Sequence, residues 1–183
     1  MSTARVLLVD DRNENLVALE AILQGLPVEC VVARSGEEAL RQLLRGEFAA
    51  ILLDAQMPGM DGFETARHIK QRERTRHTPI IFLTAADRDS HLEMRGYSVG
   101  AVDYITKPFD PWMLRTKVKV FIDLWKRGEE LREVHEHFLK LEQRQQELLD
   151  KLHQAGTRVN KLKNEHPSVD VDELSKIVQV SPD

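Results

Sequence analysis

The chain has 183 residues and a mass of 21.0 kDa, which allows one compact domain of about 100–150 residues and a remainder too short for a second sizeable core. Its 26 basic and 30 acidic side chains give a net charge of -4, so the protein as a whole does not attract nucleic acid or anionic lipid. No apolar stretch approaches ~18 residues, the first residues lack the pattern of a signal peptide, and Cys30 is the single cysteine. These features argue against secretion, a membrane span and a disulfide scaffold, and we expect a cytoplasmic protein.

Short apolar runs alternate with amphipathic stretches up to about residue 120. The runs are compact and rich in branched side chains, as in strands that are buried on both faces of a parallel sheet. They cover residues 5–10, 28–33, 49–54, 79–84 and 102–106. Helical spacing follows over residues 15–26, 62–71 and 88–97, and a further helix is expected between an N-cap at Ser35 and a stop at Gly46. This alternation predicts a doubly wound α/β fold with a five-stranded parallel sheet.

A different pattern begins at Pro111, a residue that the first turn of a helix tolerates. From Leu124 onward, apolar residues recur in heptads that are interrupted by Arg127 and Gln145. The positions that we call the seam are Leu124, Leu131, Val134, Phe138, Leu141, Gln145, Leu148, Leu152, Val159 and Leu162. Their spacing predicts a coiled coil that continues the last helix of the globular domain. The alternative is a solvated helix that lies back on the domain.

The heptad pattern divides the chain into three parts. We expect a globular domain over residues 1–125, a coiled-coil helix over residues 126–163 and a mobile tail over residues 164–183. Gly128 and Gly156 weaken the two ends of the coiled coil, because glycine costs roughly 1 kcal/mol relative to alanine in a helix. The tail is expected to form one short helical turn at about residues 172–178.

Polar residues stand at the ends of the predicted strands, where parallel α/β sheets gather their functional side chains. These residues are Asp10 and Asp11 after the first strand, Asp54 after the third, Thr84 after the fourth and Lys107 after the fifth. With the strand order 2-1-3-4-5, the three carboxylates converge in one crevice, and their like charges need a compensating cation. Mg²⁺ suits such oxygen ligands, and a phosphoryl group would bind beside Lys107 with Asp54 as its nucleophile.

Four motifs surround these residues: LLVDD at 7–11, LLDAQMPGMDGFE at 52–64, PIIFLTA at 79–85 and GAVDYITKPF at 100–109. Because of these four motifs, residues 4–125 resemble a response-regulator receiver domain. The resemblance implies a flavodoxin-like sheet. The resemblance implies that a histidine kinase phosphorylates Asp54, and that Thr84 and Lys107 contact the phosphoryl oxygens. It further implies that Mg²⁺ is bound by the carboxylates of Asp10, Asp11 and Asp54 and by the backbone carbonyl of Gln56.

The same resemblance implies a conformational switch. Thr84 would move toward the phosphoryl group, and Tyr104 would turn inward into the space that Thr84 leaves. Propensity alone would explain Tyr104 as an aromatic residue on an edge strand. The readout surface would be the helix at about residues 88–97, the fifth strand and the start of the fifth helix. Lys107–Pro108 is a candidate cis peptide by resemblance, whereas composition alone favours trans.

Three further features have simpler explanations than a separate activity. A basic cluster, formed by Arg67, His68, Lys70, Arg72, Arg74, Arg76 and His77, is typical of a solvated helix end and loop rather than a phosphate-binding groove. His135 and His137 are two residues apart, so a helix turns them about 200° from each other and disfavours a shared metal. The His135–Glu136 pair resembles the phosphoacceptor site of a kinase, but the expected downstream arginine and proline are missing.

Three interpretations of function remain. The first is a response regulator that is phosphorylated by a cognate histidine kinase, forms a homodimer through its C-terminal helix and acts on a downstream protein. The roughly 60 residues after the domain hold no helix-turn-helix and no second catalytic constellation, so we expect neither direct DNA binding nor a separate enzyme activity. In the second interpretation, the coiled coil is a signalling helix that leads to a kinase, cyclase or phosphatase domain absent from this chain. The third, a haloacid-dehalogenase-like phosphatase, is disfavoured because its nucleophile lies on the first strand in an Asp-x-Asp pattern, whereas Asp10 and Asp11 are adjacent.

Overall fold

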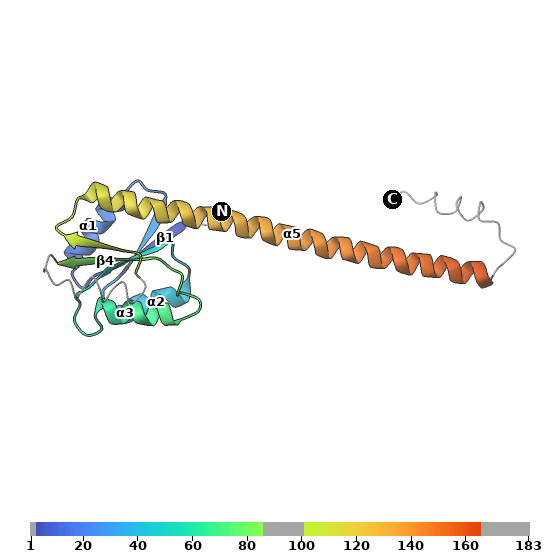
Figure 1. The fold of residues 1–183 in the computed structure, drawn as a ribbon, viewed down its shortest axis with the longest axis horizontal. Coiled ribbons are helices and arrows are strands. Elements are labelled where there is room, and N and C mark those ends of the chain that lie inside the picture. The colour runs from blue at the N-terminus through green and yellow to red at the C-terminus, as the bar shows by residue number, and fades with distance from the viewer. Residues whose placement is uncertain (1–2, 86–100, 166–183) are drawn as a thin grey trace. The chain divides into compact units, whose positions relative to one another are not determined.

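The computed structural model describes residues 3–85 and 101–165 of the chain (Figure 1). In chain order the elements are β1 (Ala4–Val9), α1 (Asn13–Leu23), β2 (Val28–Ala33), α2 (Gly36–Arg45), β3 (Ala50–Asp54), α3 (Gly62–Gln71), β4 (Ile80–Ala85), β5 (Asp103–Lys107) and α5 (Pro111–Glu165). The helix expected at residues 88–97 and the helical turn expected at 172–178 lie outside the described residues. Each of the five predicted strands is present within one or two residues of its expected bounds.

The strands form one parallel sheet in the order β2-β1-β3-β4-β5, which confirms the predicted topology. The central strand β3 is buried along its whole length, as its continuous apolar sequence predicts. The prediction of burial on both faces is wrong for β2 and β5, where most residues are partly exposed. The reason is their position at the two edges of the sheet, where one side of each strand has no neighbouring strand.

Two layers of helices cover the sheet on opposite faces (Figure 1). On one face, side chains of α2 and α3 such as Leu43 and Ile69 pack against inward residues of β1, β3 and β4. On the other face, α1 and the first turns of α5 pack against the alternate residues of the same strands, through side chains such as Leu19 and Val118. The two clusters make a single three-layer domain, with helices on both faces of one sheet.

Local signals explain where the short helices start and stop. The Ser35 hydroxyl accepts a hydrogen bond of 3.2 Å from the backbone N–H of Glu38, so the predicted N-cap of α2 is present. Helix α1 ends at Leu23, three residues before the predicted end. Gln24 leaves the helical conformation and Gly25 has a φ of 81°, a left-handed conformation that glycine adopts at little cost.

Helix α5 runs from Pro111 to Glu165 and passes through Gly128 and Gly156 without interruption. The chain divides into two compact units, Met1–Leu131 and Arg132–Asp183. In the first unit, Leu114, Val118 and Ile122 of α5 are buried. In the described part of the second unit, residues 132–165, every residue is exposed. Among the described residues, no helix is both long enough and apolar enough to span a lipid bilayer.

Candidate functional site

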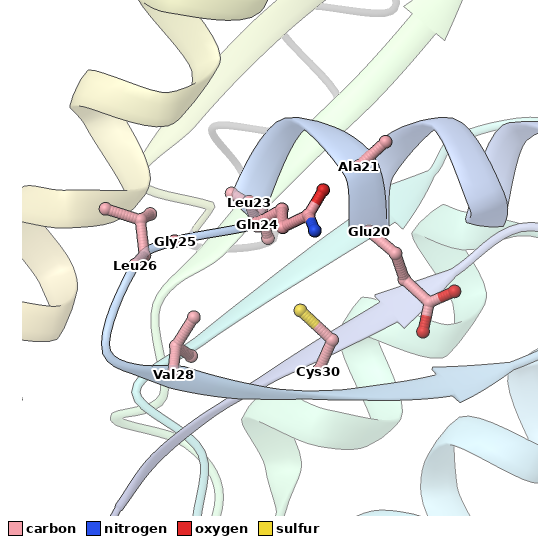
Figure 2. A pocket seen from close by; sticks show the side chains of 8 residues that line it. All are labelled: Glu20, Ala21, Leu23, Gln24, Gly25, Leu26, Val28 and Cys30. Carbon is pink, nitrogen blue, oxygen red and sulfur yellow. The ribbon is translucent and has the colours of Figure 1, made fainter.

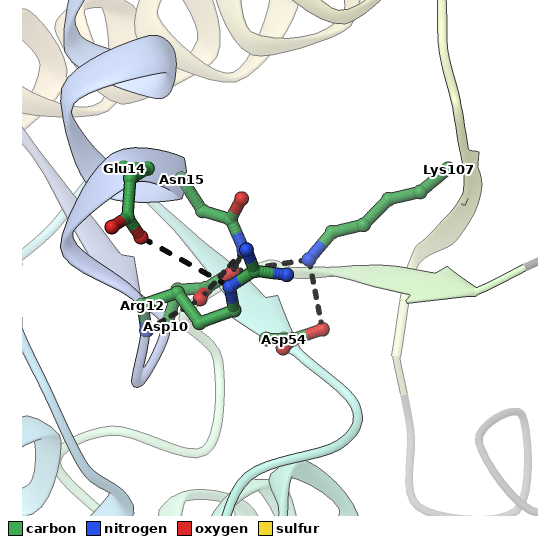
Figure 3. A network of polar contacts seen from close by, with 6 residues as sticks. All are labelled: Asp10, Arg12, Glu14, Asn15, Asp54 and Lys107. Atoms are coloured by element: carbon green, nitrogen blue, oxygen red, sulfur yellow. Dashed lines mark hydrogen bonds and ion pairs between the residues drawn. The ribbon is translucent and has the colours of Figure 1, made fainter.

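The carboxyl ends of β1, β3 and β5 bring three predicted site residues together (Figure 3). Asp10 directly follows β1, and its backbone N–H donates to the carbonyl of Ala33, so pairing with β2 extends one residue beyond the strand. Asp54 is the last residue of β3 and Lys107 the last residue of β5. Backbone pairing therefore fixes the positions from which these side chains reach one another.

Three carboxylates form a cluster at this edge. Asp10, Asp11 and Asp54 each offer an oxygen, and these oxygens lie within 4.8 Å of one another. Asp10 is fully buried and Asp54 is 7% exposed, whereas Asp11 faces the solvent. Oxygen donors of this kind, partly open to water, fit a hard divalent cation such as Mg²⁺, which keeps several of its waters when bound. The residues thus fit the metal that the sequence predicts.

Lys107 supplies a fixed positive charge within the cluster. Its ammonium donates to Asp10 Oδ2 at 3.0 Å and to Asp54 Oδ1 at 3.1 Å, so one cation bridges the two buried carboxylates (Figure 3). The lysine side chain is 28% exposed, which leaves it room to change partners. The following peptide bond, Lys107–Pro108, is cis.

The environment of Asp54 disfavours its charged form. Burial raises the pKa of the Asp54 carboxyl, the positive charge and hydrogen bond of Lys107 lower it, and the negative charge of Asp10 raises it again. A hydrogen bond from the backbone of Gln56 lowers the pKa further, yet the net direction is upward. A cation placed next to Asp54 would therefore relieve a real electrostatic cost.

Asn15 is a site residue that the sequence reasoning missed. Its side-chain amide lies 2.9 Å from both carboxylate oxygens of Asp10, and the backbone N–H of Arg12 donates to Asp10 Oδ1, also at 2.9 Å (Figure 3). With Lys107, three groups of one chain thus satisfy the buried carboxylate. The available signal was the position of Asn15 in the first turn of the helix that follows Asp10, where an amide faces back toward the strand end.

Tyr104 lies on β5, the strand that ends at Lys107, and Thr84 lies on the neighbouring strand β4. Thr84 is half-buried in β4 and stands in register with Thr106, the neighbour of Lys107. The Tyr104 ring stacks on Phe82, with ring centroids 5.3 Å apart and planes inclined by 16°. Tyr104 is partly buried against the α2–α3 side of the core, so its ring packs toward the interior in this structure.

A glycine allows α3 to begin close to the site. Gly62 is the first residue of α3, and its backbone N–H donates to the carbonyl of Ala55 at 3.1 Å. A Cβ atom at this position would collide with the backbone carbonyl of Asp54. The motif around Asp54 therefore requires glycine here because helix and strand end approach each other closely.

A separate pocket of about 480 Å³ lies at the end of α1 and is lined in part by Cys30, Glu20 and Gln24 (Figure 2). Burial raises the pKa of the Cys30 thiol, and the charges of Glu20 and Glu29 raise it further. The thiol is therefore held in its protonated, weakly nucleophilic form.

Within the basic cluster, Lys70 has a structural role. The ammonium of Lys70 donates to the carbonyls of Arg76 and Thr78, at 3.0 and 2.8 Å, and so ties the end of α3 to the chain that leads into β4. The side chains of Arg67, Arg72 and Arg74 are exposed. This arrangement agrees with the interpretation as a solvated helix end and loop.

Comparison with known proteins gives one consistent result. Residues 6–119 match the family model of the response regulator receiver domain. The response regulator PleD of Caulobacter vibrioides is 41% identical over 117 residues, which are 64% of this chain and 26% of PleD. A probable cyclic di-GMP phosphodiesterase of Vibrio cholerae is 37% identical over 120 residues, again 64% of this chain and 26% of the relative. The crystal structure of the chemotaxis protein CheY4 of Vibrio cholerae is similar with a TM-score of 0.61 and 30% identity, covering 66% of this chain and 99% of CheY4. The chain thus spans about a quarter of the length of the two sequence relatives.

Proposed function

This chain belongs to the response regulator receiver domain family, and from that premise we propose that a histidine kinase phosphorylates it on Asp54. The observation that carries the proposal is the bridge from Lys107 to Asp10 and Asp54 within a cluster of three carboxylates. The bridge places a nucleophilic oxygen and a fixed cation at the same point. An incoming phosphoryl group needs both.

In the proposed reaction, one carboxylate oxygen of Asp54 forms a bond to phosphorus while the nitrogen–phosphorus bond of the kinase phosphohistidine breaks. The imidazole leaves with the bonding electron pair, so no other reactant is needed. Asp54 is suited to this role because it is 7% exposed, and its attacking oxygen is therefore held in one place and shielded from bulk water.

The other residues of the cluster would hold the metal and the phosphoryl group. Asp10, Asp11, Asp54 and the backbone carbonyl of Gln56 would bind Mg²⁺, which neutralises phosphoryl oxygens when bound. Lys107 would move its ammonium from Asp54 to a phosphoryl oxygen, and Thr84 would donate its hydroxyl to another. In the proposed switch, Thr84 would move toward the phosphoryl group, and Tyr104, whose ring already stacks on Phe82, would fill the space that Thr84 leaves.

We further propose that residues 1–125 are the receiver and that residues 126–163 form a coiled coil that pairs two copies. The seam residues are apolar and largely exposed, for example 71% at Leu131, 68% at Val134 and 56% at Phe138. A helix that exposes such a heptad pattern gains stability by covering it with the same pattern of another helix. The output would then pass through protein contacts rather than through direct DNA binding.

A second candidate keeps the receiver and makes residues 126–163 a signalling helix that leads to an enzymatic output domain. The two sequence relatives support this candidate, because the match covers 26% of each relative and the rest of each lies outside it. One relative is named for a cyclic di-GMP phosphodiesterase activity. An open reading frame that continues after Asp183 would support this candidate over the first.

The test of the phosphoacceptor is intact-mass analysis after incubation with acetyl phosphate and Mg²⁺. The wild-type chain should gain one phosphoryl group, and Asp54→Asn should gain none, because an amide oxygen is a poor nucleophile. Asp123→Asn, which changes an exposed carboxylate of α5, is the matched control and should be labelled like the wild type. Labelling of Asp54→Asn at the wild-type level would refute the assignment.

A further inference from the structure

The seam is flanked by two histidines, His135 and His137, that have no role at the carboxyl edge. In the heptad register of the seam, the residue before each member of the Leu124 set is a g position, and the residue after each member of the Val134 set is an e position. His137 directly precedes Phe138 and is a g residue, whereas His135 directly follows Val134 and is an e residue. Both lie on α5 and are exposed in the single chain. The register therefore places both histidines at the rim of the proposed interface.

A parallel pair sets each g residue of one helix against the e residue five positions later in the other helix. Glu130 then faces His135, and His137 faces Glu142, in the second copy of the chain. Because the pair has twofold symmetry, each of these contacts occurs twice. The remaining g–e pairs between residues 123 and 163 bring no acid opposite a base: Asp123–Gly128, Arg144–Leu149, Lys151–Gly156 and Arg158–Lys163. Along both rims, histidine is thus the only basic residue type that faces an acid of the other chain.

The charged neighbours of the histidines on their own helix do not compensate a positive charge. His135 has Arg132 three residues before it and no acid three or four residues away. His137 has Glu133 four residues before it and Lys140 three residues after it, which is one charge of each sign. Residues at these spacings are the ones that meet on a helix surface. The facing acid of the second chain is therefore the main group that favours the charged form of either histidine.

The two acids differ in their own surroundings. Glu142 has no basic residue three or four positions away on α5, whereas Glu130 has Lys126 and Arg127 at these spacings. Glu142 therefore depends on the second chain for a cationic partner, and its contact with His137 should contribute more than the contact between Glu130 and His135.

We infer that protonation of His135 and His137 strengthens the pairing of two chains, so that the coiled coil is sensitive to pH. This inference rests on the proposed parallel coiled coil. Histidine is the side chain whose charge ordinarily changes between about pH 5 and 8. The paired state offers each charged histidine an acid that the single chain lacks, so it binds protons more tightly than the single chain. Association is therefore strongest at the acidic end of this range and weakens as the pH rises through it.

Sedimentation equilibrium of the full-length chain at about pH 6 and about pH 8 tests the inference. The exposed ion pairs should lower the dimer dissociation constant about tenfold at the lower pH. Replacement of both His135 and His137 by Gln should give the weaker constant at both pH values, and replacement of both by Lys should give the tighter constant at both. His153→Gln removes an exposed histidine that lies outside the e and g positions, so this matched control should keep the tenfold ratio.

The outcomes separate the pH sensitivity from the coiled coil. A tenfold ratio in the wild type that disappears in the Gln and Lys double variants supports the inference. Equal constants at the two pH values in the wild type, or a ratio that persists in the Gln double variant, refute the inference and leave the coiled coil in place. A mass of one chain at both pH values, even at the highest protein concentration, refutes the coiled coil and the pH sensitivity together.

Discussion

The carboxyl edge of the sheet and the seam of α5 differ in how far their side chains find partners within one chain. At the carboxyl edge, the buried carboxylate of Asp10 accepts hydrogen bonds from Arg12, Asn15 and Lys107 of its own chain. Along the seam, the exposed fractions of apolar side chains reach 71% at Leu131 and 69% at Leu152. The buried Asp10 carboxylate thus finds its hydrogen-bond partners within one molecule, whereas the apolar side chains of the seam face the solvent.

This difference separates two steps of signalling. In the proposed function, a phosphoryl group would bind at the carboxyl edge of a single chain, because Lys107 and Asp54 meet there. The exposed seam gains stability only when a second apolar surface covers it, at about 25 cal/mol per Å² of area removed from water. Variants at the carboxyl edge should therefore change chemistry and metal binding, while variants in the seam should change association.

The largest effect is expected from Leu141→Ala, which breaks the seam near its centre. Each dimer loses two leucine side chains, at about 2–3 kcal/mol each, which raises the dimer dissociation constant by a factor of about 1,000 to 20,000. Gln143→Ala, an exposed polar position two residues away, is the matched control and should leave the constant unchanged. Sedimentation equilibrium measures both variants, and equal dissociation constants would place Leu141 outside the interface.

A smaller effect is expected at the carboxyl edge from Asp11→Ala. Removal of one oxygen ligand should weaken Mg²⁺ binding about tenfold in a calorimetric titration. The metal-free protein should melt no earlier than the wild type, because fewer crowded carboxylates repel each other. Glu14→Ala, which removes an exposed acid of α1 near the same edge, controls for a general change in charge. An unchanged Mg²⁺ affinity in Asp11→Ala would argue against a metal ligand there.

Asn15→Ala tests whether the polar cluster is complete within the chain. The buried Asp10 carboxylate would lose the amide that contacts both of its oxygens, at a cost of about 1–3 kcal/mol in the free energy of unfolding. Asn13→Ala removes an exposed hydrogen bond to Arg34 in the same helical turn and should cost less than about 0.5 kcal/mol. Urea unfolding measures both, and equal losses would mean that Asn15 has no special role at Asp10.

The smallest effect is expected from Gln145→Leu in the seam. In a parallel, in-register pair the two Gln145 amides lie opposite each other, and a slipped pairing would leave them unsatisfied at a cost of about 1–3 kcal/mol. Leucine at this position should raise the melting temperature by a few degrees, an effect of about 1 kcal/mol, and should loosen the register. A lower melting temperature with an unchanged dimer would show that Gln145 lies outside the seam.

The sequence predicts the parts of the molecule that depend on local pattern. The apolar runs locate all five strands, and the ends of those runs locate Asp10, Asp54 and Lys107, because parallel strands place their carboxyl ends on one edge. Side-chain contacts between different elements are harder to predict from the sequence. The amide of Asn15 was missed although its place in the first turn after Asp10 was a signal, because the contact also depends on how α1 is oriented toward Asp10.

Two other differences between prediction and structure arise from features that the apolar pattern does not encode. The partial exposure of β2 follows from its edge position, which is a property of the whole sheet rather than of residues 28–33. The early end of α1 follows from the left-handed conformation of Gly25, although the apolar stripe continues to Leu26.

The proposed signalling route depends most on the pairing of two chains, each of which would be phosphorylated at its own Asp54. Sedimentation equilibrium of the full-length protein with Mg²⁺ and beryllofluoride, a mimic of the phosphoryl group, tests this claim most directly. We expect a mass of twice the 21.0 kDa chain at a protein concentration of about 10 μM. A mass equal to that of one 21.0 kDa chain under these conditions would contradict it.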